Sequence, residues 1–183
     1  MIFSMSLHSR FAYNDGKTAA ARKAGMDMSV YRLERVELQD AERVAPLFDQ
    51  YRVYYGQQSD VRAALDFVRA RLEAEESVIF AAVTGEGAER EYGGFTQLYP
   101  SFSSVTVQRL WILNDLFVAA DVRGQGIGPM LLEGAEAFAA ATGTKGLTLT
   151  TMTDNFTAQR LYEAKGYVRD DEFYTYNLFF KKG

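Results

Sequence analysis

The chain has 183 residues, of which 48% are hydrophobic and 24% charged, as expected for one soluble globular domain. Its formal net charge of −4 favours a cationic partner and argues against a nucleic-acid partner. The absence of cysteine excludes disulfides, thiolate nucleophiles and zinc–thiolate sites, and a single histidine, His8, argues against a histidine-based triad or metal site, so no metal is expected.

The N-terminal part of the chain differs from the rest. Ala, Lys and Gly dominate residues 14–25 with little periodicity, so residues 1–28 are predicted to form an extension before a domain that covers residues 29–183. This extension lacks the continuous apolar stretch of a signal peptide. The chain also has no apolar run of the roughly 18 residues that a membrane span needs. We therefore expect a cytoplasmic protein without a membrane partner.

The first half of the domain predicts one strand, two helices and then two more strands. Residues 30–36 alternate between apolar and polar side chains, which is typical of a strand. Asp40 is a candidate cap for a helix that Gly56 ends, and Ser59 or Asp60 begins a second helix. Two strands and a loop follow, over residues 78–83, 92–99 and 100–104.

The second half predicts strands alternating with helices. A third apolar strand covers residues 108–118 and leads through a glycine-rich turn into an amphipathic helix that begins near Met130. A strand, a helix and a terminal hairpin follow, over residues 147–151, 155–165, 167–169 and 173–180. The expected fold is therefore α/β (α+β), with a mixed, mostly antiparallel twisted sheet of about seven strands flanked by about four helices.

The most informative segment is the glycine-rich turn at residues 123–128, Arg-Gly-Gln-Gly-Ile-Gly. Such a turn between a strand and a helix presents backbone N–H groups at the helix N-terminus, which makes an anion site suited to phosphates. A P-loop is excluded because Gly128 is followed by Pro129-Met130. A dinucleotide fingerprint is excluded because its third glycine position falls on Pro129 or Leu131. The turn therefore predicts a binding site for a phosphorylated cofactor, and this site belongs to neither of these two motif classes.

The pattern R-x-x-G-x-G at residues 123–128 resembles the acyl-CoA loop of the GNAT superfamily of N-acetyltransferases. A second hallmark of that family is an Asn near a helix start followed by A-x-x-L-Y-x-x-x-G-[FY], and residues 155–167 match it. Asn155 and Tyr162 lie two helical turns apart and so share one helix face. The resemblance covers residues 30–180 and implies the GNAT fold, in a bacterial branch related to histone-acetyltransferase-type and polyamine-type enzymes.

The resemblance also implies acetyl-CoA as the cofactor. In the family the loop N–H groups cradle the pyrophosphate of coenzyme A, and the strand before the loop pairs its backbone with the pantetheine arm. Carried over residue by residue, the expected cofactor-binding residues are Leu116, Phe117, Val118, Arg123, Gly124, Gln125, Gly126, Ile127, Gly128, Asn155 and Tyr162. Pro129 suits the first helical turn but removes one N–H, so we expect weaker, not absent, coenzyme binding.

Two residues are candidates for proton transfer. The resemblance implies that Tyr162 protonates the leaving thiolate. Asp115 lies within an otherwise apolar strand, in a segment similar to the L-[EN]-D-[FL]-[FY]-V run of polyamine and thialysine acetyltransferases, where an acidic pair faces the acceptor amine. Asn114 replaces one of those carboxylates, which argues against a polyamine substrate. The alternatives are a structural hydrogen bond or ion pair for Asp115, a core tyrosine at Tyr162 and a helix N-cap at Asn155.

The acceptor pocket is expected between two loops that are rich in aromatic side chains. The expected substrate-binding residues are Tyr54, Tyr55, Tyr99, Asn114 and Asp115. Aromatic walls attract an alkylammonium through cation–π contacts, while the alternative for these tyrosines is simple packing.

Together these features predict an N-acetyltransferase that moves an acetyl group from acetyl-CoA to a primary amine by direct attack. The acceptor would be a small amine, an amino acid, or the lysine or N-terminus of a basic peptide. One alternative is a non-catalytic acyl-CoA-binding or sensing module, and another is a nucleotide-phosphate-binding domain. The aromatic segment at residues 173–180 predicts either a homodimer, formed by strand pairing between copies, or a strand in the chain's own sheet.

Overall fold

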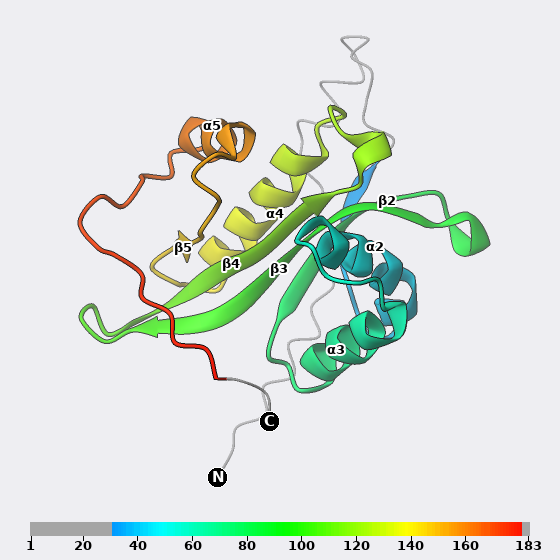
Figure 1. Cartoon of the computed structure of the whole chain (residues 1–183), viewed down its shortest axis with the longest axis horizontal. Coiled ribbons are helices and arrows are strands. Elements are labelled where there is room, and N and C mark those ends of the chain that lie inside the picture. Colours follow the sequence, from blue (N-terminus) through cyan, green and yellow to red (C-terminus); the bar gives the residue numbers. More distant parts are fainter. Residues whose placement is uncertain (1–30, 181–183) are drawn as a thin grey trace.

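A computed structural model describes residues 31–180 of the chain (Figure 1). The N-terminal extension expected at residues 1–28 lies outside the described residues. In the described part, a single sheet has the strand order β1-β2-β3-β4-β5. Its strands are β1 (Arg32–Arg35), β2 (Val78–Thr84), β3 (Glu91–Ser103), β4 (Gln108–Val118) and β5 (Leu147–Thr148). The first three pairings are antiparallel and the β4–β5 pairing is parallel, which confirms a mixed, mostly antiparallel sheet.

Helices cover both faces of the sheet (Figure 1). The described α-helices are α2 (Ala41–Tyr54), α3 (Val61–Glu73), α4 (Ile127–Ala141) and α5 (Phe156–Ala164). On one face, α2 and α3 pack through Phe48 and Val68 against Phe95 of the sheet. On the other face, α4 packs through Leu132 against Leu98. The predicted α/β class and the four expected helices are therefore confirmed within residues 31–180.

Local sequence explains the ends of α2 and α3. The backbone at Gly56 has φ +81°, a left-handed conformation that glycine adopts without strain, and α2 ends just before it. The carboxylate of Asp60 accepts a hydrogen bond from the N–H of Ala63 at 2.9 Å and so caps α3. Asp40 precedes α2 as predicted, but its side chain does not cap that helix. It accepts instead from the N–H of Glu37, at 3.1 Å.

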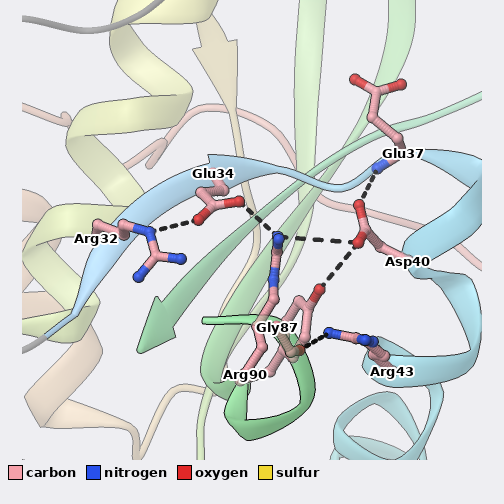
Figure 2. A network of polar contacts seen from close by, with 8 residues as sticks. Arg32, Glu34, Glu37, Asp40, Arg43, Gly87 and Arg90 are labelled. Atoms are coloured by element: carbon pink, nitrogen blue, oxygen red, sulfur yellow. Dashed lines mark hydrogen bonds and ion pairs between the residues drawn. The ribbon is translucent and has the colours of Figure 1, made fainter. Parts of the chain in front are cut away.

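Asp40 belongs to a polar network that joins β1, the start of α2 and the β2–β3 turn (Figure 2). The guanidinium of Arg90 lies between the carboxylates of Glu34 and Asp40. The hydroxyl of Tyr92 donates to Asp40 at 3.2 Å, and Arg43 donates to the carbonyl oxygen of Gly87 at 2.8 Å. These contacts make the network a structural joint between elements that are distant in sequence.

Close packing of α4 on the sheet depends on Gly94 of β3. A Cβ atom at this position would lie 2.8 Å from the carbonyl oxygen of Phe117 and 2.9 Å from a methyl group of Ile127. Both distances are shorter than normal contacts, so only glycine lets the first turn of α4 approach this closely. The helix start, where the glycine-rich turn ends, is therefore held against the sheet.

Three sequence-based expectations about strands are wrong, and the sheet has five strands instead of about seven in residues 31–180. The loop expected at residues 100–104 largely continues β3, whose last residue is Ser103. β2 pairs with β3 only as far as Leu98, so on that side no strand accepts a hydrogen bond from the backbone at position 100. Pro100, which has no N–H, is therefore tolerated there. The strand expected at residues 147–151 pairs over two residues only.

The terminal hairpin is the third of these expectations. Residues 167–180 form no strand in the structure, and most of their side chains are exposed. The alternation of side chains in this segment is typical of a strand. However, a strand needs a neighbouring strand to form hydrogen bonds with its backbone N–H and C=O groups, and none of the described elements pairs with this segment.

Candidate active site

The glycine-rich turn has the geometry of an anion site. It follows a short 3-10 helix, η3 (Ala120–Val122), and ends at Gly126, the residue that precedes α4. Gly124 and Gly126 both have φ +80°, which other residues rarely adopt. A Cβ atom at either position would have nothing within 4 Å, so the space above the turn is open.

The N–H groups of this turn are available to a ligand. Among the hydrogen bonds of residues 31–180, none is donated by the main-chain N–H groups of residues 124–128, and no side chain caps the start of α4. Exposed N–H groups at a helix N-terminus carry partial positive charge and favour phosphate. Arg123 adds a full positive charge, and its Nε donates to the carbonyl oxygen of Val118 at 3.1 Å. The residues present therefore fit a diphosphate group.

The strand before the turn has an open edge. The parallel pairing of β4 with β5 is confined to Trp111 and Ile112. The N–H of Ala119 donates to the carbonyl oxygen of Gly93 on β3. By the alternation of an antiparallel ladder, the backbone groups of Leu116 and Val118 then point to the opposite, open edge.

Phe117, the third predicted strand contact, is placed differently. It pairs with Phe95 in the ladder, so its backbone groups point toward β3. Its ring lies 5.9 Å from the ring of Tyr51, in the core under α2. We therefore expect Leu116 and Val118, and not Phe117, to pair their backbone groups with a pantetheine arm.

Asp115 is a buried carboxylate at a bulge in β4. The register between β3 and β4 shifts so that Asn114 has no partner, while Gln97 pairs with Asp115 and Leu98 pairs with Leu113. Asp115 is only 5% exposed. The side-chain amide of Asn114 contacts both carboxylate oxygens at 3.1 Å, and the hydroxyl of Tyr51 also hydrogen-bonds the carboxylate.

Burial dominates the electrostatics of this carboxylate. It raises the pKa of Asp115 above its ordinary value, and the hydrogen bonds from Tyr51 and Asn114 only partly oppose the effect. A raised pKa brings the carboxylate closer to the range in which a general base works at neutral pH. This environment is compatible with the catalytic role expected from the sequence.

Tyrosine side chains surround Asp115. The ring of Tyr55 lies 5.0 Å from that of Tyr51 and 5.2 Å from that of Tyr54. Burial raises the pKa of Tyr99 to about 12, with a further contribution from the negative charge of Asp115. The structure thus brings together the expected acceptor residues from α2, β3 and β4.

Helix α5 lies against the start of α4. A Cβ atom at Gly128 would meet the side chain of Leu161 at 3.6 Å. Tyr162 is partly buried and packs 5.8 Å from the ring of Tyr167. Burial raises the pKa of Tyr162, and Tyr55 of the acceptor cluster contributes to the same shift. Tyr162 therefore lies close enough to Tyr55 for the two phenols to interact electrostatically.

Asn155 has a structural role in the described chain. Its side-chain oxygen accepts a hydrogen bond from the N–H of Ala158 at 3.2 Å and caps α5. This is the alternative that its sequence position suggested. A contact of Asn155 with the cofactor stays a prediction.

The sequence did not single out Tyr51 as a partner of Asp115. In the sequence, Tyr51 shares one helical face with Val44, Leu47 and Phe48 and also lies among the aromatic residues near the expected acceptor pocket, and in the structure this face packs on the core. Contact with a particular carboxylate depends on how α2 crosses β4, and helical periodicity does not contain that information.

Neither a metal site nor a membrane helix is found in the described part of the chain. Its residues include no group of three or more His, Cys, Asp and Glu side chains arranged to hold a metal ion. The described helices are all too short or too polar to cross a membrane.

Comparison with known proteins identifies the family. The model of the Acetyltransferase (GNAT) family matches residues 41–167, which include the turn, Asp115 and Tyr162. The chain belongs to the GNAT family of acetyltransferases. This GNAT protein is 47% identical over 146 residues to the uncharacterized N-acetyltransferase YhfO of Bacillus subtilis (strain 168), a match that covers 80% of this chain and 95% of that protein. It is thus an acyl-CoA-dependent acetyltransferase.

Other similar proteins agree with this assignment. A probable acetyltransferase of Haemophilus influenzae (strain ATCC 51907 / DSM 11121 / KW20 / Rd) is 35% identical over 108 residues, or 58% of this chain and 71% of that protein. The crystal structure of a probable acetyltransferase is 38% identical, with a TM-score of 0.75, and the match covers 83% of this GNAT protein and 99% of that chain. An aminoglycoside acetyltransferase, meta-AAC0020, shares the fold at 16% identity and a TM-score of 0.70, over 83% of this chain and 97% of that chain.

Proposed function

We propose that this GNAT protein transfers the acetyl group of acetyl-CoA to a primary amine. The observation that supports this most is the arrangement of two features around β4. Open N–H groups lie at the C-terminal end of the strand, in residues 124–128, and the buried carboxylate of Asp115 lies at its bulge. The first suits the diphosphate of the coenzyme, and the second suits the nitrogen of an acceptor amine.

The cofactor would lie along the open edge of β4. Gly124 to Gly128 and Arg123 would hold its diphosphate, and the outward backbone groups of Leu116 and the N–H of Val118 would pair with its pantetheine amides. When bound, acetyl-CoA supplies an activated thioester. Asn155 and Tyr162 would border this groove from α5.

The acceptor nitrogen must lose a proton before it can attack. An alkylammonium of pKa about 10.4 is almost fully protonated at neutral pH. Asp115, directly or through a water molecule, would take this proton, and its raised pKa makes it a stronger base than an exposed carboxylate. The nitrogen would then bond to the acetyl carbon, and the carbon–sulfur bond would break.

Tyr162 is the candidate donor of the proton that the leaving sulfur atom would need. Its raised pKa keeps the phenol protonated at neutral pH, so it has a proton to give. Positioning of the two reactants supplies most of the acceleration in such a direct transfer. Tyr162 therefore assists a step that a thiolate can also complete more slowly without it.

The residues around Asp115 favour an alkylammonium acceptor with one positive charge near the bond that forms. Tyr54, Tyr55 and Tyr99 supply aromatic surface for cation–π contacts, and Asp115 supplies a negative charge. Asn114 contributes an amide in place of a second carboxylate. A monoamine, an amino acid or a peptide lysine or N-terminus fits this site better than a polyamine. The cytoplasmic location stays a prediction.

A panel of amines tests the proposal. The purified protein is incubated with acetyl-CoA and each amine, and free thiol is measured over time. We expect turnover with at least one primary amine, and a higher melting temperature when acetyl-CoA is present. Binding without turnover on any amine would favour the non-catalytic module, and the absence of any thermal shift at millimolar acetyl-CoA would contradict cofactor binding.

A further inference from the structure

Gln97 is a buried polar residue that the proposed transfer reaction does not use. It lies on β3, the central strand of the sheet (Figure 1), and is 0% exposed. Its Nε2 donates to the hydroxyl oxygen of Ser77 at 2.9 Å, but its Oε1 has no hydrogen-bond partner in residues 31–180. A buried amide oxygen without a hydrogen bond lowers stability, so its presence calls for an explanation.

The other buried polar residues of the described chain all form side-chain hydrogen bonds. These residues are Asp49, Ser77, Thr96 and Asp115. Among residues buried this deeply, Gln97 alone has a side-chain polar atom without a partner. This contrast indicates a partner for Oε1 that the described chain does not supply.

Gln97 lies directly opposite Asp115 in the pairing of β3 with β4. The bulge produces this match, because it brings Asp115 to the position that Asn114 would otherwise occupy. Directly opposite residues of an antiparallel pair have Cβ atoms about 4.5–5.5 Å apart and point to the same face. The unpartnered amide and the candidate general base are therefore neighbours on one face of the sheet.

The hydrogen bond to Ser77 determines how the amide is turned. Ser77 precedes β2, which lies on the opposite side of β3 from β4. The nitrogen and the oxygen of a planar amide point in different directions, so Oε1 is directed away from Ser77. Phe95 and Tyr99 flank Gln97 on the same face of β3, and the ring of Phe95 lies 5.7 Å from that of Tyr51. Oε1 therefore lies among the aromatic side chains of the expected acceptor region.

A primary amine has one hydrogen that suits this oxygen. Its ammonium form carries three N–H bonds, and acetylation removes two of these protons, so one N–H remains in the amide product. An N-methyl amine starts with two N–H bonds and keeps none. A hydrogen-bond acceptor beside Asp115 can therefore hold the retained N–H of a primary amine throughout the reaction, while Asp115 takes a proton that leaves.

We propose that Oε1 of Gln97 accepts a hydrogen bond from the acceptor nitrogen and makes the site selective for primary amines over N-methylated amines. This inference rests on the proposed acetyl transfer and adds a specificity-determining residue to it. Gln97 and Asp115 hold two different hydrogens of one nitrogen, which orients its lone pair toward the acetyl carbon. A methyl group in place of the retained hydrogen leaves Oε1 unpaired, and sites built to bind an N–H discriminate against substrates that lack it.

A matched pair of amines tests the proposal in the wild-type protein. The best amine of the panel and its N-methyl derivative are compared by kcat/KM for thiol release. We expect a preference of about 10- to 100-fold for the primary amine. Equal kcat/KM values would overturn this inference and leave acetyl transfer intact. The absence of turnover with any amine would contradict the proposed function, and this inference with it.

Gln97→Met tests whether the amide oxygen causes the preference. Methionine has a similar volume but no oxygen, so we expect kcat/KM to fall about tenfold for the primary amine and little for the N-methyl amine. The KM for acetyl-CoA and the acidic limb of the pH profile should stay as in the wild type, because Oε1 has no hydrogen bond to Asp115. Gln108→Met makes the same change at an exposed residue of β4 and should keep the full preference.

Two results for Gln97→Met would contradict this assignment. An undiminished preference for the primary amine would show that the oxygen does not contact the acceptor. An acidic limb that moves to higher pH would show instead that the amide donates to Asp115 and lowers the pKa of that carboxylate. If Gln97→Met does not fold, the comparison of the two amines in the wild-type protein remains the test.

Discussion

The side-chain amide of Asn114 contacts both carboxylate oxygens of Asp115, at 3.1 Å each, across a single peptide unit of β4. Two consecutive residues of a regular strand point to opposite faces. The bulge at Asn114 breaks this alternation and lets the amide reach its neighbour. The bulge therefore sets both the orientation of the carboxylate and the place where an amine would meet it.

Replacement of Asp115 by Asn should abolish most of the amine acetylation. The loss of a positioned general base lowers kcat by about 10²- to 10⁴-fold. The measurement is steady-state thiol release with the best amine from the panel. Asp66→Asn, at an exposed residue of α3, is the control and should keep full activity. A loss of less than threefold for Asp115→Asn would assign Asp115 a purely structural role.

The same substitution should change how stability depends on pH. Burial raises the pKa of Asp115 above 3.8, the value expected in an unfolded chain, so the folded state binds this proton more tightly. Stability is then lost as pH rises from 3.8 through the folded-state pKa. Asp115→Asn cannot ionise, so it should melt at a higher temperature than the wild type at pH 8, and the difference should disappear near pH 4. An Asp115→Asn variant that is less stable than the wild type at pH 8 would contradict the expected direction of this difference.

Tyr51→Phe should shift the pH profile more than it lowers the maximal rate. The hydroxyl of Tyr51 hydrogen-bonds the carboxylate and lowers the pKa of Asp115, so its removal should raise that pKa further. The acidic limb of kcat/KM against pH should move to higher pH. Tyr54→Phe, which removes a hydroxyl from a neighbouring ring, should leave the limb in place. If the acidic limb of the pH profile stays in place in Tyr51→Phe, this hydrogen bond does not affect the pKa of the general base.

Tyr162→Phe should lower kcat by about 10- to 1000-fold, because the phenol helps the sulfur leave but is not required for it. The KM for acetyl-CoA should change little, since the ring remains. Tyr167→Phe removes the hydroxyl of the adjacent ring and is the matched control. A loss of kcat of threefold or less in Tyr162→Phe would show that this residue does not take part in the mechanism.

Gly126→Ala should weaken the binding of acetyl-CoA. Alanine at φ +80° costs about 1–2 kcal/mol, and relief of this strain would turn the N–H groups of the loop away from their present directions. We expect the KM for acetyl-CoA to rise by about tenfold. Gly143→Ala places the same strain at the other end of α4, where φ is +66° and the surrounding space is also open. Equal KM values for these two variants would indicate a general effect on the helix.

Sequence patterns predicted the parts of the molecule that are encoded locally. The glycine-rich turn, the span of β4 and the helix after Asn155 were found because spacing and capping residues determine them. The position of the bulge, at Asn114, was not predicted, because it depends on the register between β4 and β3. The early end of β5 and the unpaired segment after Tyr167 were missed for a related reason: a strand exists only where a neighbour accepts it.

The most direct measurement is a crystal structure of the protein with acetyl-CoA. We predict density for the diphosphate within hydrogen-bonding distance of the N–H groups of residues 124–128, and for the thioester between Asp115 and Tyr162. Diphosphate density elsewhere on the molecule, with those N–H groups left in contact with solvent, would contradict the proposed site.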